Sequence, residues 1–406
     1  MSGPLVVHKY GGTSVADAER IRAVARRVAD TRKAGTGVVV VVSAMGHATD
    51  ELLDLAGEVS PHHHPRELDM LLTAGERVSM ALLAMAIADE GVEALSLTGS
   101  QAGILTDTEH GRAKITDIRA FRVEEALADG KVVIVAGFQG VSPDTKEITT
   151  LGRGGSDTTA VALAAALGAE SCEICTDVDG VFTADPRIVP GARRIESISY
   201  EEMLEMAANG AGVLSSRAAD FCMRFKVPLR VRSSFHDGPG TWVRESTMEQ
   251  PVVSGIVHEA SAAKVTVHGV PDRPGVAAAL FQPLAAQGVN IDMIVQNIST
   301  DGSTDISFTV PRPQAETARS VAEEVAGDIG ADGVDVDESI AKVSIVGSGM
   351  QEAPAVPARM FQVLGSAGIN IGMISTSAIR ISCVVAKDRA EEAVQLLHAA
   401  FFEGGS

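Results

Sequence analysis

An internal repeat in the C-terminal third of the chain constrains the fold most strongly. Residues 264–294 and 342–374 both read as a strand, a loop, a helix and a second strand that begins after Gly-x-Asn-Ile. Each copy has about the length of a small βαββαβ module, and repeated units of this kind bury their apolar faces by packing on one another. The repeat therefore predicts two ferredoxin-like βαββαβ domains, side by side.

The first 245 residues follow another pattern, in which β-rich runs alternate with amphipathic helical stretches. The runs are residues 5–8, 38–42, 95–98, 132–136, 173–176 and 229–232. Ala-rich segments between them repeat apolar residues at helical spacing, as in Val78, Leu82, Leu83 and Ile87. This alternation predicts an α/β domain with three αβα layers around a mainly parallel sheet. A turn cluster at 236–241 and a polar stretch at 244–251 mark its end.

Composition narrows the classes of function. The 406 residues carry a formal net charge of −19, so the chain has no broad basic surface for nucleic-acid phosphates or anionic membranes. The N-terminus lacks a charged leader, and no uninterrupted apolar stretch reaches the ~18 to 20 residues of a membrane span. We expect a cytoplasmic protein that acts on small molecules, with no nucleic-acid or membrane partner.

Four cysteines are present, and two of them form Cys172-Glu-Ile-Cys175, a spacing that can hold a metal or a redox pair. In a strand, however, residues three apart point to opposite faces, so these two thiols cannot share one metal. We therefore predict core cysteines and no metal site. The run His62-His63-His64 is predicted to lie in a solvated loop.

Two glycine loops carry the chemistry. Lys9-Tyr-Gly-Gly-Thr-Ser14 follows the first strand, with Asp17 placed for a helix cap, and Gly152-Arg-Gly-Gly-Ser-Asp157 precedes a predicted helix at 158–167. At such helix starts the backbone amides can approach an anion, and each loop adds a basic side chain. A glycine pair after a strand is often only a tight turn. Two such loops together predict one shared anionic ligand.

A third segment, Thr176-Asp-Val-Asp-Gly-Val-Phe-Thr-Ala-Asp-Pro-Arg187, follows a strand and is typical of a nucleotide or Mg²⁺ site. The sequence contains no G-x-x-x-x-G-K-[ST] motif, and residues 152–157 lack the third glycine of a dinucleotide fingerprint. These absences disfavour a P-loop enzyme and an NAD-dependent enzyme.

Nearly the whole chain resembles an aspartate kinase of the amino acid kinase family. The matching motifs are residues 9–15, 42–45, 49–50, 73–77, 98–103, 152–157, 176–187 and 227–234. The repeat is similar to the tandem ACT domains of that family, which sense amino acids. The resemblance implies a kinase domain at 1–245, a linker with the first strand of the second ACT domain at 246–262, the first ACT domain at 263–338 and the remainder of the second at 339–406.

The resemblance implies transfer of the ATP γ-phosphate, with Mg²⁺, to the β-carboxylate of L-aspartate, as the first step toward lysine, threonine and methionine. That carboxylate is ionised at pH 7, so catalysis reduces to positioning and charge neutralisation. The implied catalytic residues are Lys9, Arg153 and Asp157. The implied aspartate-binding residues are Ser43, Thr49, Glu76, Arg153, Gly154, Gly155 and Ser156.

Each of these residues has an implied role. Lys9 would contact the transferred phosphoryl group, and Asp157 would orient Lys9. Arg153 would clamp the α-carboxylate of aspartate, and Glu76 would hold its ammonium group. Phosphoryl oxygens would be held by the backbone amides of Gly11, Gly12, Gly154 and Gly155.

The resemblance also implies an ATP-binding set and an effector-binding set. The ATP-binding set is Lys9, Tyr10, Gly11, Gly12, Thr13, Ser14, Thr176, Asp177, Asp179, Phe182, Thr183, Ala184, Asp185, Pro186 and Arg187. The effector-binding set is Asp272, Ala277, Asn290, Ile291, Asp292, Gln296, Asn370 and Ile371. Threonine and, to a smaller extent, lysine are the implied effectors. The implied assembly is a homodimer or an α₂β₂ complex with a regulatory chain that starts near Met248.

Two places depart from the family pattern. Gly212 stands in Gly-Ala-Gly-Val-Leu, where the family has a lysine that reaches the ATP phosphates. In the second ACT domain, Gly372 and Ala378 stand where the family commonly has glutamates. The loss of both carboxylates disfavours a cationic effector such as lysine, so feedback inhibition is expected to be altered.

Other interpretations stay open from the sequence alone. One is another carboxylate kinase of the same fold, such as one acting on N-acetylglutamate. In such an enzyme Glu76 would have no ammonium group to pair with, because an acetylated amine carries no charge. A catalytically weak or dead amino-acid sensor would account for Gly212 but not for the survival of Lys9 and Arg153. Glu76 itself could form only a surface ion pair with Arg77.

Overall fold

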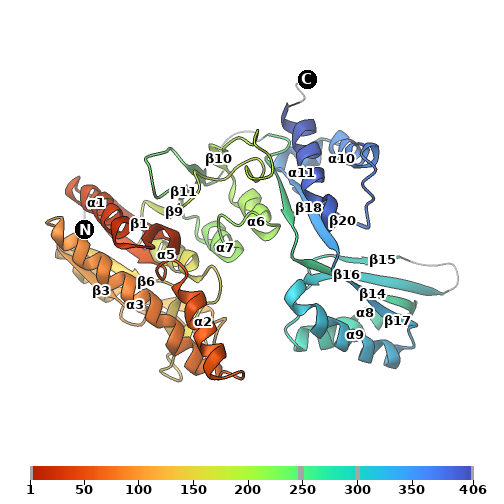
Figure 1. Ribbon diagram of the computed structural model, residues 1–406, viewed down its shortest axis with the longest axis horizontal. Coiled ribbons are helices and arrows are strands. Elements are labelled where there is room, and N and C mark those ends of the chain that lie inside the picture. Colours follow the sequence, from red (N-terminus) through yellow and green to blue (C-terminus); the bar gives the residue numbers. More distant parts are fainter. Residues whose placement is uncertain (1–2, 246–250, 298–301, 404–406) are drawn as a thin grey trace. The chain divides into compact units, whose positions relative to one another are not determined.

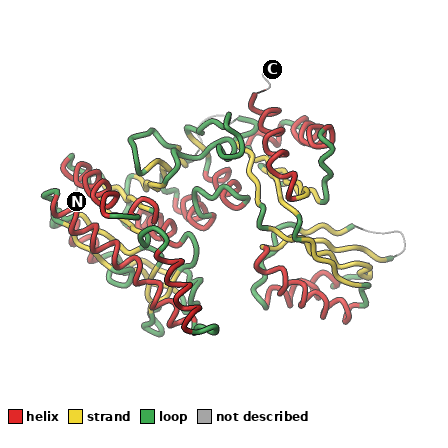
Figure 2. The backbone as a smooth tube through the Cα atoms, viewed as in Figure 1, coloured by secondary structure: helices red, strands yellow, loops and turns green. Residues whose placement is uncertain are grey.

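The computed structural model describes residues 3–245, 251–297 and 302–403, which form two compact units. The first unit comprises Met1–Phe182 and Arg194–Met248, and the second comprises Thr183–Arg193 and Glu249–Ser406. Figures 1 and 2 show the elements of each unit. The predicted start of a regulatory chain near Met248 lies outside the described residues.

An eight-stranded sheet forms the centre of the first unit, in the order β10-β12-β11-β9-β1-β2-β6-β3. Its strands are β1 (Leu5–Tyr10), β2 (Gly37–Val42), β3 (Ala94–Leu97), β6 (Val132–Ala136), β9 (Ser171–Thr176), β10 (Ser197–Ile198), β11 (Leu229–Ser233) and β12 (Thr241–Val243). Neighbouring strands are parallel except β11 and β12. This confirms the predicted sheet, and all six apolar runs lie in it.

Helices cover both faces of this sheet. Because helices contact β2 on both sides, Val38 to Val42 are fully buried, as the unbroken apolar run predicts. α1 (Ala18–Lys33) and α3 (Pro65–Asp89) lie side by side (Figure 1). α5 (Gly155–Ala166) contacts β1, β2 and β9. The other helices are α2 (Ala48–Val59), α4 (Phe121–Ala128), α6 (Tyr200–Ala208) and α7 (Ser216–Phe225).

Helix α3 has an unusual composition. Among the described residues it is the one helix whose length and mean hydropathy of 1.5 would suit a membrane span. It nevertheless packs on α1, β3 and β6 and buries the carboxylates of Asp69 and Glu76. The helical pattern predicted there is correct, but only Leu83 and Ile87 of the four quoted positions are buried. Val78 and Leu82 are 53% and 39% exposed.

A small sheet, ordered β5-β4-β7-β8, completes the first unit. Its strands are β4 (Ile104–Thr106), β5 (Ile115–Ile118), β7 (Gln139–Val141) and β8 (Ile148–Thr150). β8 leads directly into the second glycine loop and α5. The first glycine loop enters the 3₁₀ turn η1 (Gly12–Val15), after which Asp17 caps α1 by accepting the amide of Arg20 at 2.9 Å.

The second unit contains the two predicted modules. The first module is β14 (Ala262–Pro271), α8 (Val276–Ala286), β15 (Ile294–Gln296), β16 (Ser303–Pro311), α9 (Ala315–Ile329) and β17 (Gly333–Asp337). The second is β18 (Ile340–Val346), α10 (Ala355–Ser366), β19 (Met373–Thr376), β20 (Arg380–Ala386) and α11 (Ala390–His398). Short 3₁₀ or π turns are η2 (Arg312–Gln314), η3 (Ser348–Glu352), η4 (Lys387–Arg389) and η5 (Ala399–Glu403).

The last strand of the second module comes from earlier in the chain. β13 (Gly255–Glu259) pairs antiparallel with β18, and the sheet runs β13-β18-β20-β19. The first module runs β15-β16-β14-β17. The first module is therefore inserted within the second, as the resemblance implies.

One stretch of the predicted kinase domain lies in the second unit instead. Thr183–Arg193 packs there, with Ala184 and Val189 in the hydrophobic core of the second module. The carbonyl of Thr183 accepts the amide of Ile256 at 2.8 Å, and its hydroxyl lies 2.9 Å from Nε2 of the buried His398. The predicted domain of residues 1–245 is therefore interrupted, because the apolar side chains of this stretch fit the second module.

The four cysteines are buried free thiols. Burial raises the pKa of Cys175 to about 11. Cys175 lies beside Tyr10, while Cys172 lies near Cys222 and Asp157, so the two thiols face opposite sides of β9. These positions agree with the prediction of core cysteines.

Candidate active site

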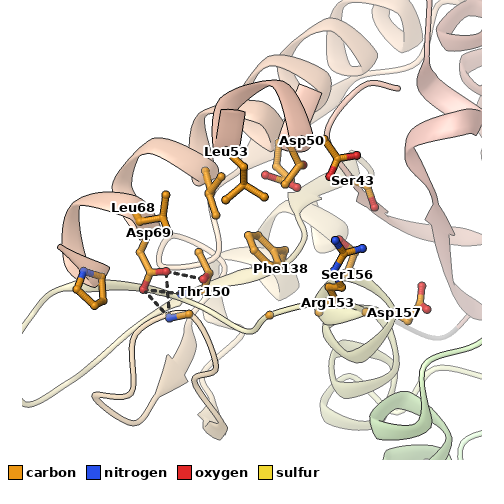
Figure 3. A pocket seen from close by; sticks show the side chains of 18 of the residues that line it. Ser43, Asp50, Leu53, Leu68, Asp69, Phe138, Thr150, Arg153, Ser156 and Asp157 are labelled. Carbon is orange, nitrogen blue, oxygen red and sulfur yellow. Dashed lines mark hydrogen bonds between the residues drawn. The ribbon is translucent and has the colours of Figure 1, made fainter. Parts of the chain in front are cut away.

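A cavity of about 520 Å³ opens where the parallel strands end at their carboxyl edge (Figure 3). Every residue predicted for catalysis or aspartate binding lines it: Lys9, Ser43, Thr49, Glu76, Arg153, Gly154, Gly155, Ser156 and Asp157. These residues come from β1, from the segment after β2, from α2, from α3 and from the start of α5. The fold thus brings five separate stretches of sequence to one site.

Lys9 and Asp157 form the closest charged contact in the cavity. Alternation along β1 buries Tyr10 against α1 and turns Lys9 toward α5, where its Nζ lies 2.7 Å from Oδ1 of Asp157. The side chains are only 13% and 11% exposed. The other carboxylate oxygen of Asp157 accepts the amide of Ser215 at 3.4 Å. Asp157 therefore holds the lysine cation in a fixed, poorly hydrated position.

Arg153 offers the cavity a free cation. Within the described part of the chain its guanidinium makes no hydrogen bond or ion pair. It lies between Gly152 and Gly154, whose φ angles of 79° and 73° favour glycine. A Cβ at Gly154 would also lie 2.3 Å from Cβ of Ser215. The backbone around Arg153 is thus closely defined while its side chain is left for a ligand.

Glu76 is a buried carboxyl group that lines the same cavity. It is 3% exposed, and its Oε1 accepts the amide of Ala44 at 3.1 Å. Its Oε2 is buried, with no hydrogen-bond partner in the described residues. Burial raises the pKa of Glu76 to about 7. The surface ion pair with Arg77 is therefore excluded, and a half-satisfied carboxylate that lines a cavity suits a ligand ammonium group.

Two details of the glycine loops correct the predicted roles. The amide of Gly155 donates to the carbonyl of Gly152 at 3.0 Å, so it is not free to bind a phosphoryl oxygen. The side chain of Tyr10 is fully buried in the core between the sheet and α1, so it cannot touch a nucleotide. Ser14 is also buried, and its hydroxyl lies 2.9 Å from Oγ of Ser234. Of the first loop, Lys9 alone lines the cavity.

The predicted nucleotide segment is divided between the units. Thr176 ends β9, adjacent to β1, and Gly11 donates to the carbonyl of Cys175 at 3.5 Å, so this half lies beside the first glycine loop. Asp177 accepts the hydroxyl of Thr176 at 3.0 Å, and Asp179 lies 2.7 Å from His236. The other half belongs to the second unit, where Asp185 and Arg187 pair at 2.6 Å.

Several cavity residues were not predicted from the sequence, among them Phe138, Asp69 and Thr150. Phe138 has a φ of 69°, which is rare for an aromatic residue and typical of a functional site. Its place between glycines, in Gly-Phe-Gln-Gly, is a weak signal that was available. Asp69 and Thr150 also line the cavity. An aspartate in a helix is usually exposed, so no pattern pointed to Asp69.

The predicted effector residues are spread over the second unit. Asp292 pairs with Lys342 of the second module, and Arg380 lies 3.9 Å away. Asn290 donates its amide to Gln314 at 2.9 Å. Ile291 and Ile371 each pack against the core of their own module. Gln296 lies exposed on β15, Asp272 and Ala277 flank the start of α8, and Asn370 is exposed.

Comparisons with known proteins identify the family. Residues 4–233 match the amino acid kinase family, and residues 265–325 and 343–401 match the ACT domain. An aspartokinase of Mycolicibacterium smegmatis is 56% identical over 407 residues, which cover 99% of this chain and 97% of that protein. The chain belongs to the aspartokinase family. Its members are kinases that phosphorylate a carboxyl group, and this chain is such an enzyme.

Solved structures of aspartokinases share the fold. The crystal structure of E. coli aspartokinase III in complex with aspartate and ADP (R-state) has a TM-score of 0.84 and 27% identity, covering 98% of this chain and all of that one. The structure of the same enzyme with lysine and aspartate (T-state) has a TM-score of 0.75, with 98% and 99% coverage.

The position of Glu76 predicts a pH dependence. A carboxyl group with a pKa of about 7 is mostly ionised at pH 8 and about one-tenth ionised at pH 6. Because only the anion pairs with an ammonium group, kcat/KM for aspartate at saturating ATP should fall about tenfold from pH 8 to pH 6. Glu76→Gln should have a low and nearly flat profile over this range. A flat wild-type profile, measured with a coupled ADP assay, would contradict the assignment.

Proposed function

We propose that this protein is an aspartate kinase that converts L-aspartate and ATP into 4-phospho-L-aspartate and ADP. The observation that carries the proposal is the set of charges in one cavity. Lys9 offers a cation for a phosphoryl group, Arg153 a cation for an α-carboxylate, and Glu76 an anion for an ammonium group. An N-acetylated substrate would leave Glu76 buried without a partner, which disfavours the other carboxylate kinases.

The geometry supports a direct in-line transfer. An oxygen of the β-carboxylate attacks the γ-phosphorus, a new P–O bond forms, and the bond from the γ-phosphorus to the bridging oxygen of ADP breaks. No proton needs to leave the nucleophile, since it is already an anion. Lys9, held by Asp157, stabilises the negative charge that spreads over the phosphoryl oxygens. Arg153 and Glu76 fix the two ends of aspartate so that its β-carboxylate faces this group.

ATP and Mg²⁺ are the proposed co-substrate and its cation. The described residues hold no group of three or more His, Cys, Asp or Glu side chains suited to a metal. Mg²⁺ would therefore arrive with ATP and be held mainly by phosphate oxygens, which is its usual mode in kinases. The nucleotide contacts of Thr176, Asp177, Asp179, Phe182 and Thr183–Arg187 stay a prediction. We also propose a cytoplasmic location and a place at the start of lysine, threonine and methionine synthesis.

A hydroxamate assay with purified protein tests this function. Aspartate, but not N-acetylglutamate, should yield an acyl hydroxamate in the presence of Mg-ATP. Lys9→Ala should lose at least a hundredfold in kcat, because an unneutralised phosphoryl group costs several kcal/mol in a poorly hydrated site. Its circular dichroism should match the wild type. A folded Lys9→Ala protein with a tenth of wild-type kcat would reject the role of Lys9, and a wild type that makes no hydroxamate would favour the inactive sensor.

Gly212 has room for the lysine that the family pattern places there. Apart from its two chain neighbours, no atom of the described residues lies within 4 Å of a Cβ built at Gly212. Two other cations that could take over the role have partners of their own: Arg217 donates to the carbonyls of Leu151 and Ala113, and Lys226 pairs with Glu245. The missing charge is therefore not replaced by either of them.

Gly212→Lys should accordingly improve the use of ATP. A cation about 4 Å from a phosphate contributes on the order of a few kcal/mol before desolvation. We expect a roughly tenfold lower KM for ATP or higher kcat, which corresponds to ~1.4 kcal/mol. Gly212→Gln, similar in length but uncharged, is the matched control. Equal kinetic constants for the two variants would refute the charge argument.

We further propose an ACT-mediated oligomer, either a homodimer or an α₂β₂ complex. β15 is an edge strand with all three residues exposed, and Ile294 is 54% exposed. Ile374 on the edge strand β19 is 45% exposed. Apolar edge strands favour pairing with another chain. Light scattering at micromolar concentration should show an oligomer that Ile294→Lys weakens, and a wild-type monomer would reject the proposal.

Threonine and lysine are the proposed effectors, with lysine the weaker. The Asp292 carboxylate is already paired with Lys342, and Gly372 and Ala378 supply no charge, so a lysine ammonium group finds few anions. A Cβ at Gly372 would meet its nearest neighbour at 3.7 Å, so a side chain fits there. Millimolar lysine alone should inhibit little, and lysine added to threonine should inhibit little more than threonine alone. Gly372→Glu should increase the inhibition by lysine. Strong inhibition by lysine in the wild type would contradict this proposal.

A further inference from the structure

Asp69 is a buried carboxylate that lines the cavity, and within the described part of the chain it pairs with no lysine or arginine. It is 1% exposed on the second turn of α3. Its Oδ1 accepts the hydroxyl of Thr150 at 2.5 Å, and its Oδ2 accepts the amide of Thr150 at 3.1 Å. The amide of Gly111 lies 3.1 Å from Oδ1, and Nδ1 of His110 lies 2.6 Å from Oδ2. Figure 3 shows Asp69 beside Thr150.

These contacts occupy both oxygens of the carboxylate. A carboxylate offers about four lone-pair sites, and here four donor groups from the loop at residues 110–111 and from the end of β8 converge on it. Asp69 therefore has no acceptor left for a substrate, although it lines the cavity. An asparagine would present an amide hydrogen to some of these donors, so only the carboxylate satisfies all of them. Burying such a charge costs free energy. Because Asp69 has no acceptor left for a ligand, any effect that it has on catalysis acts through the two segments that it joins.

Arg217, at the start of α7, also joins the two segments, residues 110–113 and 150–151, by donating hydrogen bonds to a carbonyl group of each. It donates to the carbonyl of Leu151 at 3.0 Å and to that of Ala113 at 2.8 Å. The two segments also join directly, because the amide of Ala113 donates to the carbonyl of Thr150 at 2.9 Å. The amide of Leu151 donates to the carbonyl of Phe138 at 2.9 Å. All four backbone groups of residues 150 and 151 are thus fixed.

The fixed dipeptide is the base of the loop that carries Arg153. Arg153 follows Leu151 after a single glycine, and its own side chain has no anchor in the described residues. The place where its guanidinium meets a ligand is therefore set by the backbone before it. A shift of about 1 Å in such a group is enough to impair catalysis strongly.

We propose that Asp69 is a positioning residue for the amino-acid substrate, which acts by locking residues 150–151 so that Arg153 can clamp the α-carboxylate. Arg217 completes the lock from the other side. This inference rests on the proposed function, because it assigns Arg153 to aspartate. A residue that only stabilises the fold would affect both substrates. Substitution of Asp69 should instead raise the KM for aspartate and leave the KM for ATP unchanged.

Steady-state kinetics of Asp69→Asn test the inference. We expect the aspartate KM to rise about tenfold or more and the ATP KM to stay within about twofold, since the first glycine loop is untouched. A double-mutant cycle with Arg153→Lys should show that Asp69→Asn costs much less once Arg153 is altered. A fall in kcat with both KM values unchanged, or fully multiplicative losses in the cycle, would overturn the proposal.

Two further variants keep the test decisive. Thr150→Val removes one donor and leaves the carboxylate, so a smaller rise in aspartate KM, of about threefold, is expected even if Asp69→Asn does not fold. Thr73→Val is the matched control, because Thr73 is buried on the same helix but bonds only to Met70 within it. Wild-type aspartate kinase activity is measured first. Its absence would reject the proposed function, whereas an active wild type with unchanged aspartate KM in Thr150→Val and Asp69→Asn would reject only this inference.

Discussion

The ion pair between Lys9 and Asp157 links the two halves of the candidate site. Lys9 is the next-to-last residue of the central strand β1, Asp157 lies in the first turn of α5, and both side chains are nearly buried. Two charges removed from water in this way are stable only when they are paired. The fold must therefore hold β1 and α5 together at this point. Once it does, the two glycine loops, which are far apart in the sequence, face the same cavity.

Around this pair, some polar groups that line the cavity lack a hydrogen-bond or ion-pair partner in the described residues. Arg153 has no partner in the described residues, and one oxygen of Glu76 is buried without a hydrogen bond. Phe138 has a backbone conformation that costs of order 1–3 kcal/mol. The surrounding structure stabilises these features through hydrogen bonds, such as those that Asp69 and Arg217 make. A rigid frame with unpaired groups at its centre suits an amino acid that carries both charges.

The second unit includes a stretch from within the predicted kinase domain. Thr183–Arg193, which includes residues predicted to bind ATP, contributes Ala184 and Val189 to the core of the second module. Gln395 donates to the carbonyl of Ile188 at 2.9 Å, and the hydroxyl of Thr183 contacts His398. The second half of the predicted nucleotide segment, residues 183–187, therefore packs with the core of the second ACT module. The side chain of Ala184 belongs to that core.

Sequence alone determined the elements and most of the chemistry. The alternation of β-rich runs and helical stretches predicted a mainly parallel sheet between helix layers, and the repeat predicted two βαββαβ modules. The displaced strand β13 was implied by the family resemblance. The family resemblance implied that Lys9, Glu76 and the second glycine loop bind the substrates, and these residues line the cavity. These features are local, because periodicity, glycine conformation and charge can be read within a few residues.

Tertiary structure decided what depends on distant neighbours. Burial of Glu76 raised its pKa, and the carbonyl of Gly152 took the amide of Gly155. Tyr10 was turned into the core by strand alternation beside a lysine that faces the site. Asp69 gave no signal in the sequence, because its role comes from donors on a loop and at the end of β8 that meet it only after folding. The packing of Thr183–Arg193 with the second module was equally invisible, since a short apolar segment can fill whichever core the folded chain brings beside it.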